Sequence, residues 1–135
     1  MLYFLGYISI FIGISILLPA WVSYFYSEPY TSSFIALGLS VAIIGAAARY
    51  FFKKDAFLDF KTVILIVVSG WILIVIIGSL PYLITGTVKS PVDAFFESMS
   101  GFTTTGATIL PEITSLPYSI LFWRSLTHWM GGMGI

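Results

Sequence analysis

The sequence contains no cysteine, a single histidine and few charged residues. Without cysteine there can be no disulfide framework, no thiolate nucleophile and no cysteine-ligated metal site. One histidine also excludes a metal site built from several histidines. Six Lys and Arg residues balance six Asp and Glu residues, so the formal net charge is zero and does not indicate a nucleic-acid partner.

Apolar residues dominate what is present. Hydrophobic residues make up 59% of the 135 positions, charged residues only 9%, and the mean hydropathy is +1.02. A soluble domain needs more charge than this to cover its surface, so the lipid bilayer is the expected solvent. The composition therefore predicts a membrane protein, and its long apolar segments predict an all-α membrane protein that crosses the bilayer several times.

Three apolar segments, 2–26, 34–52 and 62–85, are long enough to cross a bilayer at about 1.5 Å per residue. The first ends in an aromatic cluster suited to the lipid headgroups, and Pro19 near that end is expected to kink or finish the helix. An alternative is that the first segment is a signal peptide, but it lacks a basic n-region and its apolar part is too long.

Small residues recur on the second segment at Gly38, Ala42 and Ala46, with Gly45 beside them. This spacing favours the close approach of another helix, although small residues are also common in membrane helices without such a role.

Four of the six basic residues cluster after the second segment. They are Arg49, Lys53, Lys54 and Lys61. The positive-inside rule, in which acidic residues such as Asp55 and Asp59 count little, places this loop in the cytoplasm. Glu28 and Lys89 are then external, and the third segment runs outward. A partner could also dock on the basic loop, but a purely topological role is the simpler interpretation.

The stretch 98–108, SMSGFTTTGAT, is rich in hydroxyl groups and glycine and has no charge, although it lies between apolar segments. Before it, Ser90 and Pro91 open a short predicted helix that runs to Met99 and stops at Gly101. A short helix followed by Thr-Thr-Thr-Gly indicates a re-entrant pore helix with a selectivity-filter loop. Non-helical backbone at membrane depth must be buried in protein or line a watery cavity. The alternative is a polar external loop.

The direction of the short helix favours a cation. Since the third segment runs outward, the short helix enters from the external side. Its C-terminus, which carries partial negative charge, then points into the membrane. Carbonyl groups beside a glycine are also what cation filters use to replace a hydration shell. We therefore predict a cation filter that is reached from outside.

Residues 117–135 form a further apolar, aromatic helix that begins at Pro117. About 19 positions are barely one span, so we expect a partial sequence. Arg124 lies roughly 10 Å below the outer start of this helix, at a depth similar to that of Glu97. We predict a buried ion pair between Arg124 and Glu97 that supports the pore helix. The alternative is that Arg124 reaches the interface while Glu97 faces a water-filled vestibule.

Four motifs resemble one membrane–pore–membrane repeat of the Trk/Ktr/HKT superfamily of potassium transporters, and most of all its TrkH type. They are GSLPY at 78–82, DAFFESMSGFTTTGAT at 93–108, LFWRS at 121–125 and WMGGMGI at 129–135. The resemblance implies a pore of four such repeats in one polypeptide. It divides this chain into a leading helix pair with its cytoplasmic loop, 1–61, and a first repeat, 62–135, truncated in its second helix. His128 stands where the TrkH type is expected to carry an amide.

The resemblance implies potassium uptake across the cytoplasmic membrane. On the family's pattern the backbone carbonyls of Thr104 and Thr105 coordinate the potassium ion, with Thr103 and Gly106 as neighbours in the filter. A glycine at 106 suits a loop whose backbone angles exclude most side chains. Potassium is then the transported substrate, with no cofactor. The implied partners are the lipid bilayer, the remaining repeats, a second copy in a homodimer and a cytosolic nucleotide-binding regulatory subunit.

Two other functions compete with transport. A structural or assembly subunit that does not conduct would have no use for the hydroxyl-rich loop. An enzyme could use Asp93 and Glu97, which lie four apart on one face of the short helix. Since the sequence has no metal-binding cluster, nucleophile motif or phosphate loop, we do not expect an enzyme.

Overall fold

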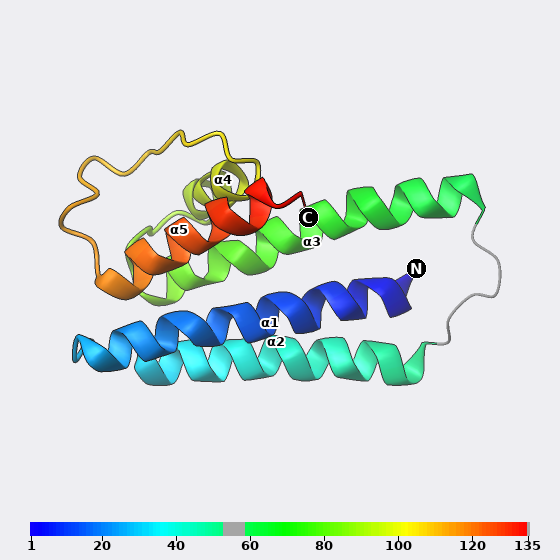
Figure 1. Cartoon of the computed structure of the whole chain (residues 1–135), viewed down its shortest axis with the longest axis horizontal. Helices are drawn as coiled ribbons and strands as arrows, with labels where there is room; N and C mark the ends of the chain where they lie inside the picture. Colours follow the sequence, from blue (N-terminus) through cyan, green and yellow to red (C-terminus); the bar gives the residue numbers. More distant parts are fainter. Residues whose placement is uncertain (53–58, 135) are drawn as a thin grey trace.

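Five α-helices make up the computed structural model, and the part of the chain that it describes, residues 1–52 and 59–134, contains no strand (Figure 1). The helices are α1 Leu2–Phe25, α2 Thr31–Phe51, α3 Phe60–Ile84, α4 Pro91–Phe102 and α5 Tyr118–Gly132. Lys53, Lys54 and Asp55, which belong to the predicted cytoplasmic loop, lie outside the described residues. The prediction of an all-α protein is confirmed.

Within the described residues, α1, α2 and α3 are the helices long and apolar enough to cross a membrane. They match the three predicted segments, and no boundary differs by more than three residues. Of the two outcomes expected for Pro19, a kink or the end of the helix, the second is excluded, because α1 continues through it to Phe25. Pro19 is fully buried, so packing around the helix compensates for the backbone hydrogen bond that proline cannot make.

The antiparallel pair α1 and α2 is built on glycine contacts (Figure 1). A Cβ added to Gly13 would lie 2.7 Å from the backbone nitrogen of Ala42, and one added to Gly45 would lie 2.7 Å from the carbonyl oxygen of Gly6. The predicted small-residue stripe is therefore a close helix–helix contact. Ala46 is exposed, so its inclusion in the stripe was wrong. Gly45 continues the contact instead, because contact positions on a helix are three or four residues apart.

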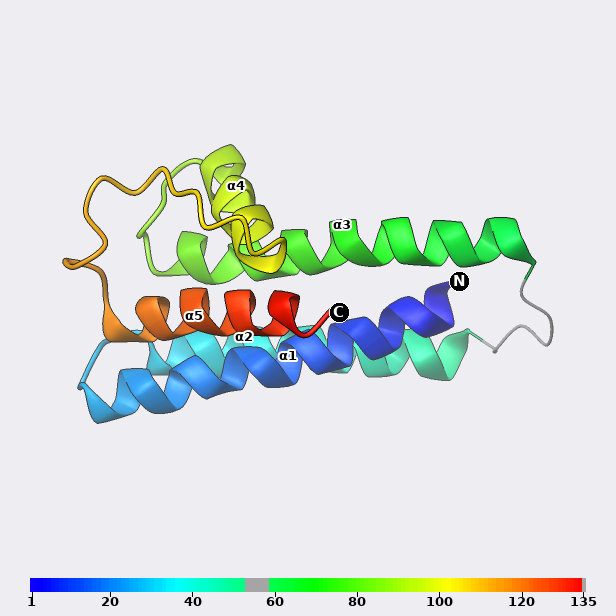
Figure 2. The same ribbon diagram turned by 45° about the horizontal axis from the view of Figure 1, so that its top comes forward.

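The hairpin of α1 and α2 joins the other helices mainly through α1, which packs on α2 and also contacts α3 and α5 (Figure 2). Arg49, in the last turn of α2, lies with its guanidinium carbon 4.0 Å from the centroid of the Tyr7 ring on α1. This cation–π contact holds together the end of the hairpin that includes the N-terminal turns of α1.

The start of α4 follows the prediction. Ser90 is the N-cap and its hydroxyl oxygen accepts from the backbone N–H of Asp93 at 3.4 Å, while Pro91 occupies the first turn. The helix lies across α3 rather than along it (Figure 2).

The end of α4 differs from the prediction, because the helix continues past Met99 and through Gly101 to Phe102. A Cβ added to Gly101 would lie 2.4 Å from Oγ1 of Thr127 on α5. This glycine therefore allows α5 to approach α4 and does not end the helix.

The helices α3, α4 and α5 meet at Gly78. Trp123 on α5 donates from Nε1 to the Gly78 carbonyl at 3.0 Å, and Ser98 on α4 donates to the Val75 carbonyl at 2.8 Å. A Cβ added to Gly78 would lie 2.5 Å from the ring of Phe102. Since these groups are buried, the hydrogen bonds fix the position of α4 as well as satisfying the polar atoms.

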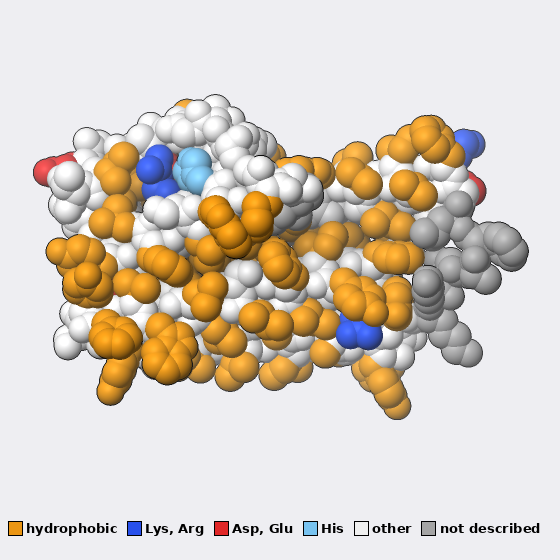
Figure 3. All heavy atoms as spheres, viewed as in Figure 1, with side chains coloured by type: hydrophobic (Ala, Val, Ile, Leu, Met, Phe, Trp, Pro, Cys, Tyr) orange, Lys and Arg blue, Asp and Glu red, His pale blue; other side chains and the backbone are white. Residues whose placement is uncertain are grey.

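The segment 103–117 returns from the end of α4 to the end of the bundle where α3 ends and α5 begins (Figures 1 and 2). In the same view as Figure 1, hydrophobic side chains cover much of the visible face along α1 and α2. Over α4 and the loop, other side chains and backbone prevail (Figure 3). The surface of this loop is therefore unlike the apolar face of the hairpin.

Candidate functional site

The chain reverses direction at Thr104, directly after α4. Thr103 is the C-cap, and Thr104 has a φ of 56°, in the left-handed region. The Thr104 N–H donates to the Gly101 carbonyl and the Thr105 N–H donates to the Ser100 carbonyl, both at 3.0 Å. This pair of hydrogen bonds is a Schellman motif, in which the left-handed position is usually glycine.

The reversal ties the first N–H groups of the loop to α4. The N–H groups of Thr103, Thr104 and Thr105 all donate back to carbonyls of α4. Residues 103–109 are exposed, and among the described residues no hydrogen-bond donor reaches the carbonyl oxygens of 103–106. The loop therefore presents free acceptors beside three N–H groups, those of 103–105, that are already satisfied, which suits a cation.

The backbone conformation at position 106, rather than a lack of space for a side chain, favours glycine there. Its φ is 76°, and a Cβ added there would meet nothing within 4 Å. Thr104 adopts a similar φ although it is β-branched, which costs about 1–2 kcal/mol. Two left-handed residues two positions apart give the loop a shape that extended or helical backbone cannot have. The hydroxyl of Thr103 donates to the Met99 carbonyl at 2.8 Å and so ties the loop to α4.

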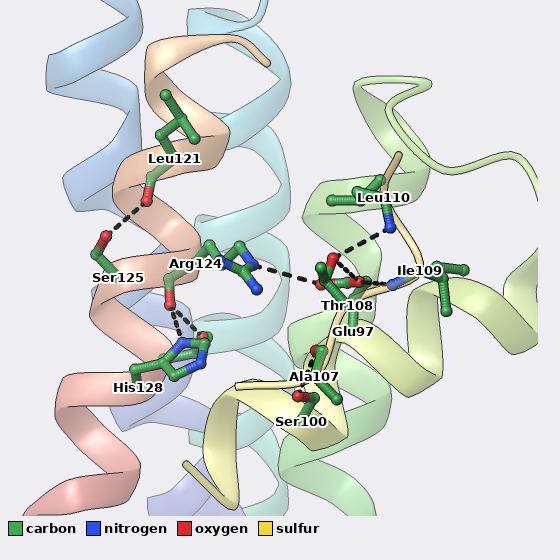
Figure 4. Close-up of polar contacts among 11 residues, drawn as sticks. Glu97, Ser100, Ala107, Thr108, Ile109, Leu110, Leu121, Arg124, Ser125 and His128 are labelled. Carbon is green, nitrogen blue, oxygen red and sulfur yellow. Dashed lines mark hydrogen bonds and ion pairs between the residues drawn. The ribbon is translucent and has the colours of Figure 1, made fainter. Parts of the chain in front are cut away.

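The outgoing part of the loop is held against α4 by two side chains (Figure 4). The Ser100 hydroxyl donates to the Ala107 carbonyl at 2.6 Å. The Ile109 N–H donates to Oε1 of Glu97 at 2.7 Å, and the Thr108 hydroxyl donates to the same oxygen. These contacts hold residues 107–109, called the return segment below, against α4. The four unpaired carbonyls of 103–106 therefore lie between the end of α4 and the return segment.

The second oxygen of Glu97 faces α5. Nε of Arg124 donates to Oε2 of Glu97 at 3.4 Å, and the Glu97 side chain is only 1% exposed (Figure 4). The contact expected between these two residues is thus present, and Glu97 does not face open space. The bonds from Thr108 and Ile109 to Glu97 were not predicted, because a hydroxyl eleven residues further along carries no sequence signal that identifies its partner.

Two polar side chains of α5 contact the backbone carbonyl of Arg124. This carbonyl accepts from the hydroxyl of Thr127 at 2.7 Å and lies 2.8 Å from Nδ1 of His128 (Figure 4). Since a carbonyl can only accept, Nδ1 of His128 carries the proton in this contact. A Cβ added to Gly131 would lie 2.1 Å from the Phe102 carbonyl, so α5 also fits closely under the end of α4.

The sequence is similar to known cation transport proteins. A family model described as "TrkH: Cation transport protein" matches residues 31–135. An uncharacterized cation transporter of Methanocaldococcus jannaschii is 39% identical over 99% of this chain and 28% of its own length. The Trk system potassium uptake protein TrkH of Halomonas elongata is 36% identical over 97% of this chain and 28% of its own length.

The fold is similar to a solved structure as well. The crystal structure of the potassium transporter TrkH from Vibrio parahaemolyticus matches 100% of this chain at a TM-score of 0.91 and 34% sequence identity, over 29% of that chain. This chain therefore spans less than a third of the length of the relatives that it matches.

Proposed function

This chain belongs to the TrkH family of cation transport proteins, and we propose that it provides the first pore repeat of a potassium uptake protein. It is a multi-pass protein of the cell membrane. Relatives whose names specify potassium uptake support potassium as the transported ion. In this proposal residues 1–61 are a leading helix pair with its loop, and residues 62–135 belong to the first repeat.

The observation that carries the proposal is the set of unpaired carbonyls in the exposed residues 103–106. We assign the carbonyl oxygens of Thr104 and Thr105 as potassium ligands, with Thr103 and Gly106 as their neighbours in the filter. Such oxygens replace part of the hydration shell of the ion, so that potassium enters the site without a large desolvation cost. The C-terminal end of α4 adds partial negative charge beside the same loop.

A complete filter needs a ring of such loops. The relatives are long enough to contain three further repeats, since this chain covers only 28% of their length. We propose that the remaining repeats supply the other carbonyls around a shared axis. Each loop must then hold its oxygens at a fixed distance from that axis, which makes the bonds from Ser100 and Glu97 to the return segment important for selectivity.

We propose that the ion pair of Glu97 and Arg124 supports the filter. One carboxylate connects three elements: α4, on which it lies, the return segment through Thr108 and Ile109, and α5 through Arg124. A buried carboxylate is stable only when its charge and lone pairs are satisfied, and this one receives donors on both oxygens. Movement of α5 would therefore disturb the return segment directly.

The proposed orientation follows from the charges. The loop around Arg49 and Lys61 is cytoplasmic, Glu28 and Lys89 are external, and α4 with its loop is re-entrant from outside. In the full-length protein without other cysteines, we expect Lys89→Cys to react with a membrane-impermeant maleimide in intact cells and Lys61→Cys to react only after permeabilisation. Both positions are exposed. Labelling of position 61 from outside would exclude this orientation.

Two other functions are less consistent with the geometry. A non-conducting assembly subunit does not explain a strained loop with four unpaired carbonyls. An enzyme that uses Asp93 and Glu97 would need free carboxylate oxygens, whereas both oxygens of Glu97 are occupied. We propose that the protein is not an enzyme and uses no cofactor. By the family resemblance we further propose a homodimer that binds a cytosolic nucleotide-binding regulatory subunit.

The test of the filter compares two glycines with the same backbone requirement. Gly106 and Gly86 have φ values of 76° and 68°, and an added Cβ meets nothing within 4 Å at either position. Gly86 lies in the turn before α4, outside the loop 103–106. The substitutions Gly106→Ser and Gly86→Ser therefore impose a similar backbone cost of about 1–2 kcal/mol at different places.

We expect Gly106→Ser to reduce rubidium uptake relative to sodium uptake in the full-length protein, while Gly86→Ser leaves this ratio unchanged. The ratio is measured in cells without other potassium uptake systems and normalised to the amount of protein in the membrane. An unchanged ratio in the Gly106 variant, at normal expression, would show that this loop is not the filter.

A further inference from the structure

Glu28 caps a helix to which it is distant in sequence. Its Oε1 accepts from the backbone N–H of Tyr118 at 2.6 Å, and its Oε2 accepts from the N–H and the hydroxyl of Ser119. Tyr118 and Ser119 are the first two residues of α5, whereas Glu28 lies in the turn between α1 and α2. The N-cap residue of α5, Pro117, makes no side-chain capping bond.

The start of α5 offers both hydrogen-bond donors and partial positive charge to the Glu28 carboxylate. The first N–H groups of a helix have no partner within the helix, and the partial positive charge there attracts a carboxylate. Glu28 satisfies two such groups at once and brings the negative charge to the favourable end of α5. No nearby side chain on α5 replaces it, since the first turn of that helix contains no acidic residue.

The turn that carries Glu28 is well ordered by its own contacts. The Glu28 N–H donates to the Ser23 carbonyl at 2.8 Å, and the Ser23 hydroxyl donates to the Glu28 carbonyl at 3.3 Å. Beside it, the rings of Tyr26 and Tyr118 stack with centroids 4.1 Å apart and an interplanar angle of 20°. Two contacts therefore join the same turn of the hairpin to the same end of α5.

The position of α5 matters for the candidate filter. Arg124 lies six residues below Tyr118, or about 9 Å along the helix, and binds Glu97, which holds the return segment of the loop. A helix is stiff over this length, so a shift of its first turn along its axis also shifts Arg124.

We propose that Glu28 is a positioning residue for the filter: by capping α5 from the leading hairpin, it sets the depth of Arg124 relative to Glu97. This inference rests on the proposed filter function. It assigns to the leading helix pair a role in ion selectivity, in addition to its role in the membrane. A purely structural cap would instead affect only the amount of folded protein.

The principal test uses Glu28→Gln and Glu28→Ala in the full-length protein. Glutamine is nearly isosteric, removes the charge and keeps one acceptor, whereas alanine removes every contact. We expect the rubidium-to-sodium uptake ratio per folded molecule to fall roughly two- to fivefold for alanine and less for glutamine, the size of one helix-terminal charge interaction. The matched control is Glu112→Gln, an exposed carboxylate in the segment between α4 and α5 that, among the described residues, accepts only from the Thr114 hydroxyl.

A second measurement tests whether Glu28 acts on selectivity through Arg124. If Glu28 acts through Arg124, Glu28→Ala should cause no further loss of selectivity in a protein that already carries Arg124→Gln. Equal fold-changes in both backgrounds would overturn the positioning role. So would an unchanged uptake ratio for Glu28→Ala with a reduced yield of folded protein, because that outcome describes a structural cap.

A third measurement does not depend on transport. In a full-length background without other cysteines, Tyr26→Cys with Tyr118→Cys is treated with a short bismaleimide. We expect efficient cross-linking when Glu28 is present and a clear loss with Glu28→Ala. If the parent protein fails to distinguish rubidium from sodium, the proposed function is wrong, while the cross-link still reports the cap. If cross-linking is unaffected by Glu28→Ala, the capping inference fails although the filter stands.

Discussion

The leading hairpin and the unit of α4, its loop and α5 are both tightly packed, but the middle of α1 and the middle of α4 satisfy their buried polar groups differently. In α1 the buried hydroxyls of Ser9 and Ser15 donate to carbonyls four residues back in the same helix. In the α4 unit, Glu97 and Ser98 bond to other elements. Polar groups satisfied locally permit several helix arrangements, whereas groups satisfied at a distance permit only one.

Both regions contain glycines at backbone contacts, so close approach alone does not distinguish them. Gly13 meets backbone atoms of α2, and Gly131 meets the backbone of Phe102 at the end of α4. The two glycines differ in what they contact. Gly13 contacts another apolar helix, whereas Gly131 contacts Phe102, which is followed directly by the candidate filter. The same kind of substitution should therefore have different functional results in the two regions.

The largest expected effect comes from the buried charge. Glu97→Gln or Arg124→Gln alone should destabilise the purified full-length protein by about 3–5 kcal/mol, because Glu97 is buried, Arg124 is mostly so, and each change leaves the other charge without its partner. The double variant should lose less than the sum of the two, as measured by a double-mutant cycle on thermal unfolding.

The matched substitution in the hairpin is Arg49→Gln, which removes an exposed cation–π contact worth about 0.5–1 kcal/mol. Two results would contradict this difference between the regions in the stability contributed by their charged residues. One is strictly additive losses of stability at Glu97 and Arg124, and the other is a loss at Arg49 as large as theirs.

An intermediate effect is expected at the contact glycines. Gly131→Ala and Gly13→Ala each place a methyl group against backbone, at 2.1 Å and 2.7 Å, and overpacking of this kind costs about 1–3 kcal/mol. Both variants should therefore show lower thermal stability. Only Gly131→Ala should also lower the rubidium-to-sodium uptake ratio, because only Gly131 contacts Phe102, the last residue before the loop. A comparable loss of selectivity in Gly13→Ala would contradict the separation of roles.

The smallest effect tests the strain in the loop and should differ in sign between neighbours. Thr104→Gly relieves a left-handed β-branched residue, which outweighs the entropy cost of glycine, so stability should rise by up to about 1 kcal/mol. Thr105→Gly has the entropy cost and also loses the hydrogen bond between the Thr105 and Thr103 hydroxyls, so it should lower stability by at least about 0.5–1 kcal/mol. Thermal unfolding of the purified full-length protein measures both. A loss of stability in Thr104→Gly would show that the side-chain contacts of this threonine outweigh its backbone strain.

Much of the fold could be predicted because hydropathy is a local property. The three long apolar runs specify α1, α2 and α3 without reference to any partner, and Ser90 with Pro91 specifies the start of α4. The ends of helices were less predictable. Gly101 resembles a stop signal in the sequence, yet the packing of Thr127 against it keeps it within α4.

The candidate site, like the fold, could be predicted only in part. The loop 103–106 could be chosen from its composition, and Arg124 could be matched with Glu97 because few charges lie within the apolar segments and these two lie at similar depth. The remaining contacts depend on the tertiary structure alone. Thr108 and Ile109 reach Glu97 only because the chain reverses at Thr104.

The sequence by itself therefore determined the solvent, the spanning helices and the segment that is proposed as the filter, because composition and periodicity act over one helix at a time. Only the tertiary structure decided which carbonyls remain free and which carboxylate caps which helix. Glu28 and Tyr118 are 90 residues apart, and no local pattern connects them. Their contact arises because the hairpin packs along α5, and a hydrogen bond is specified only when both partners are in place.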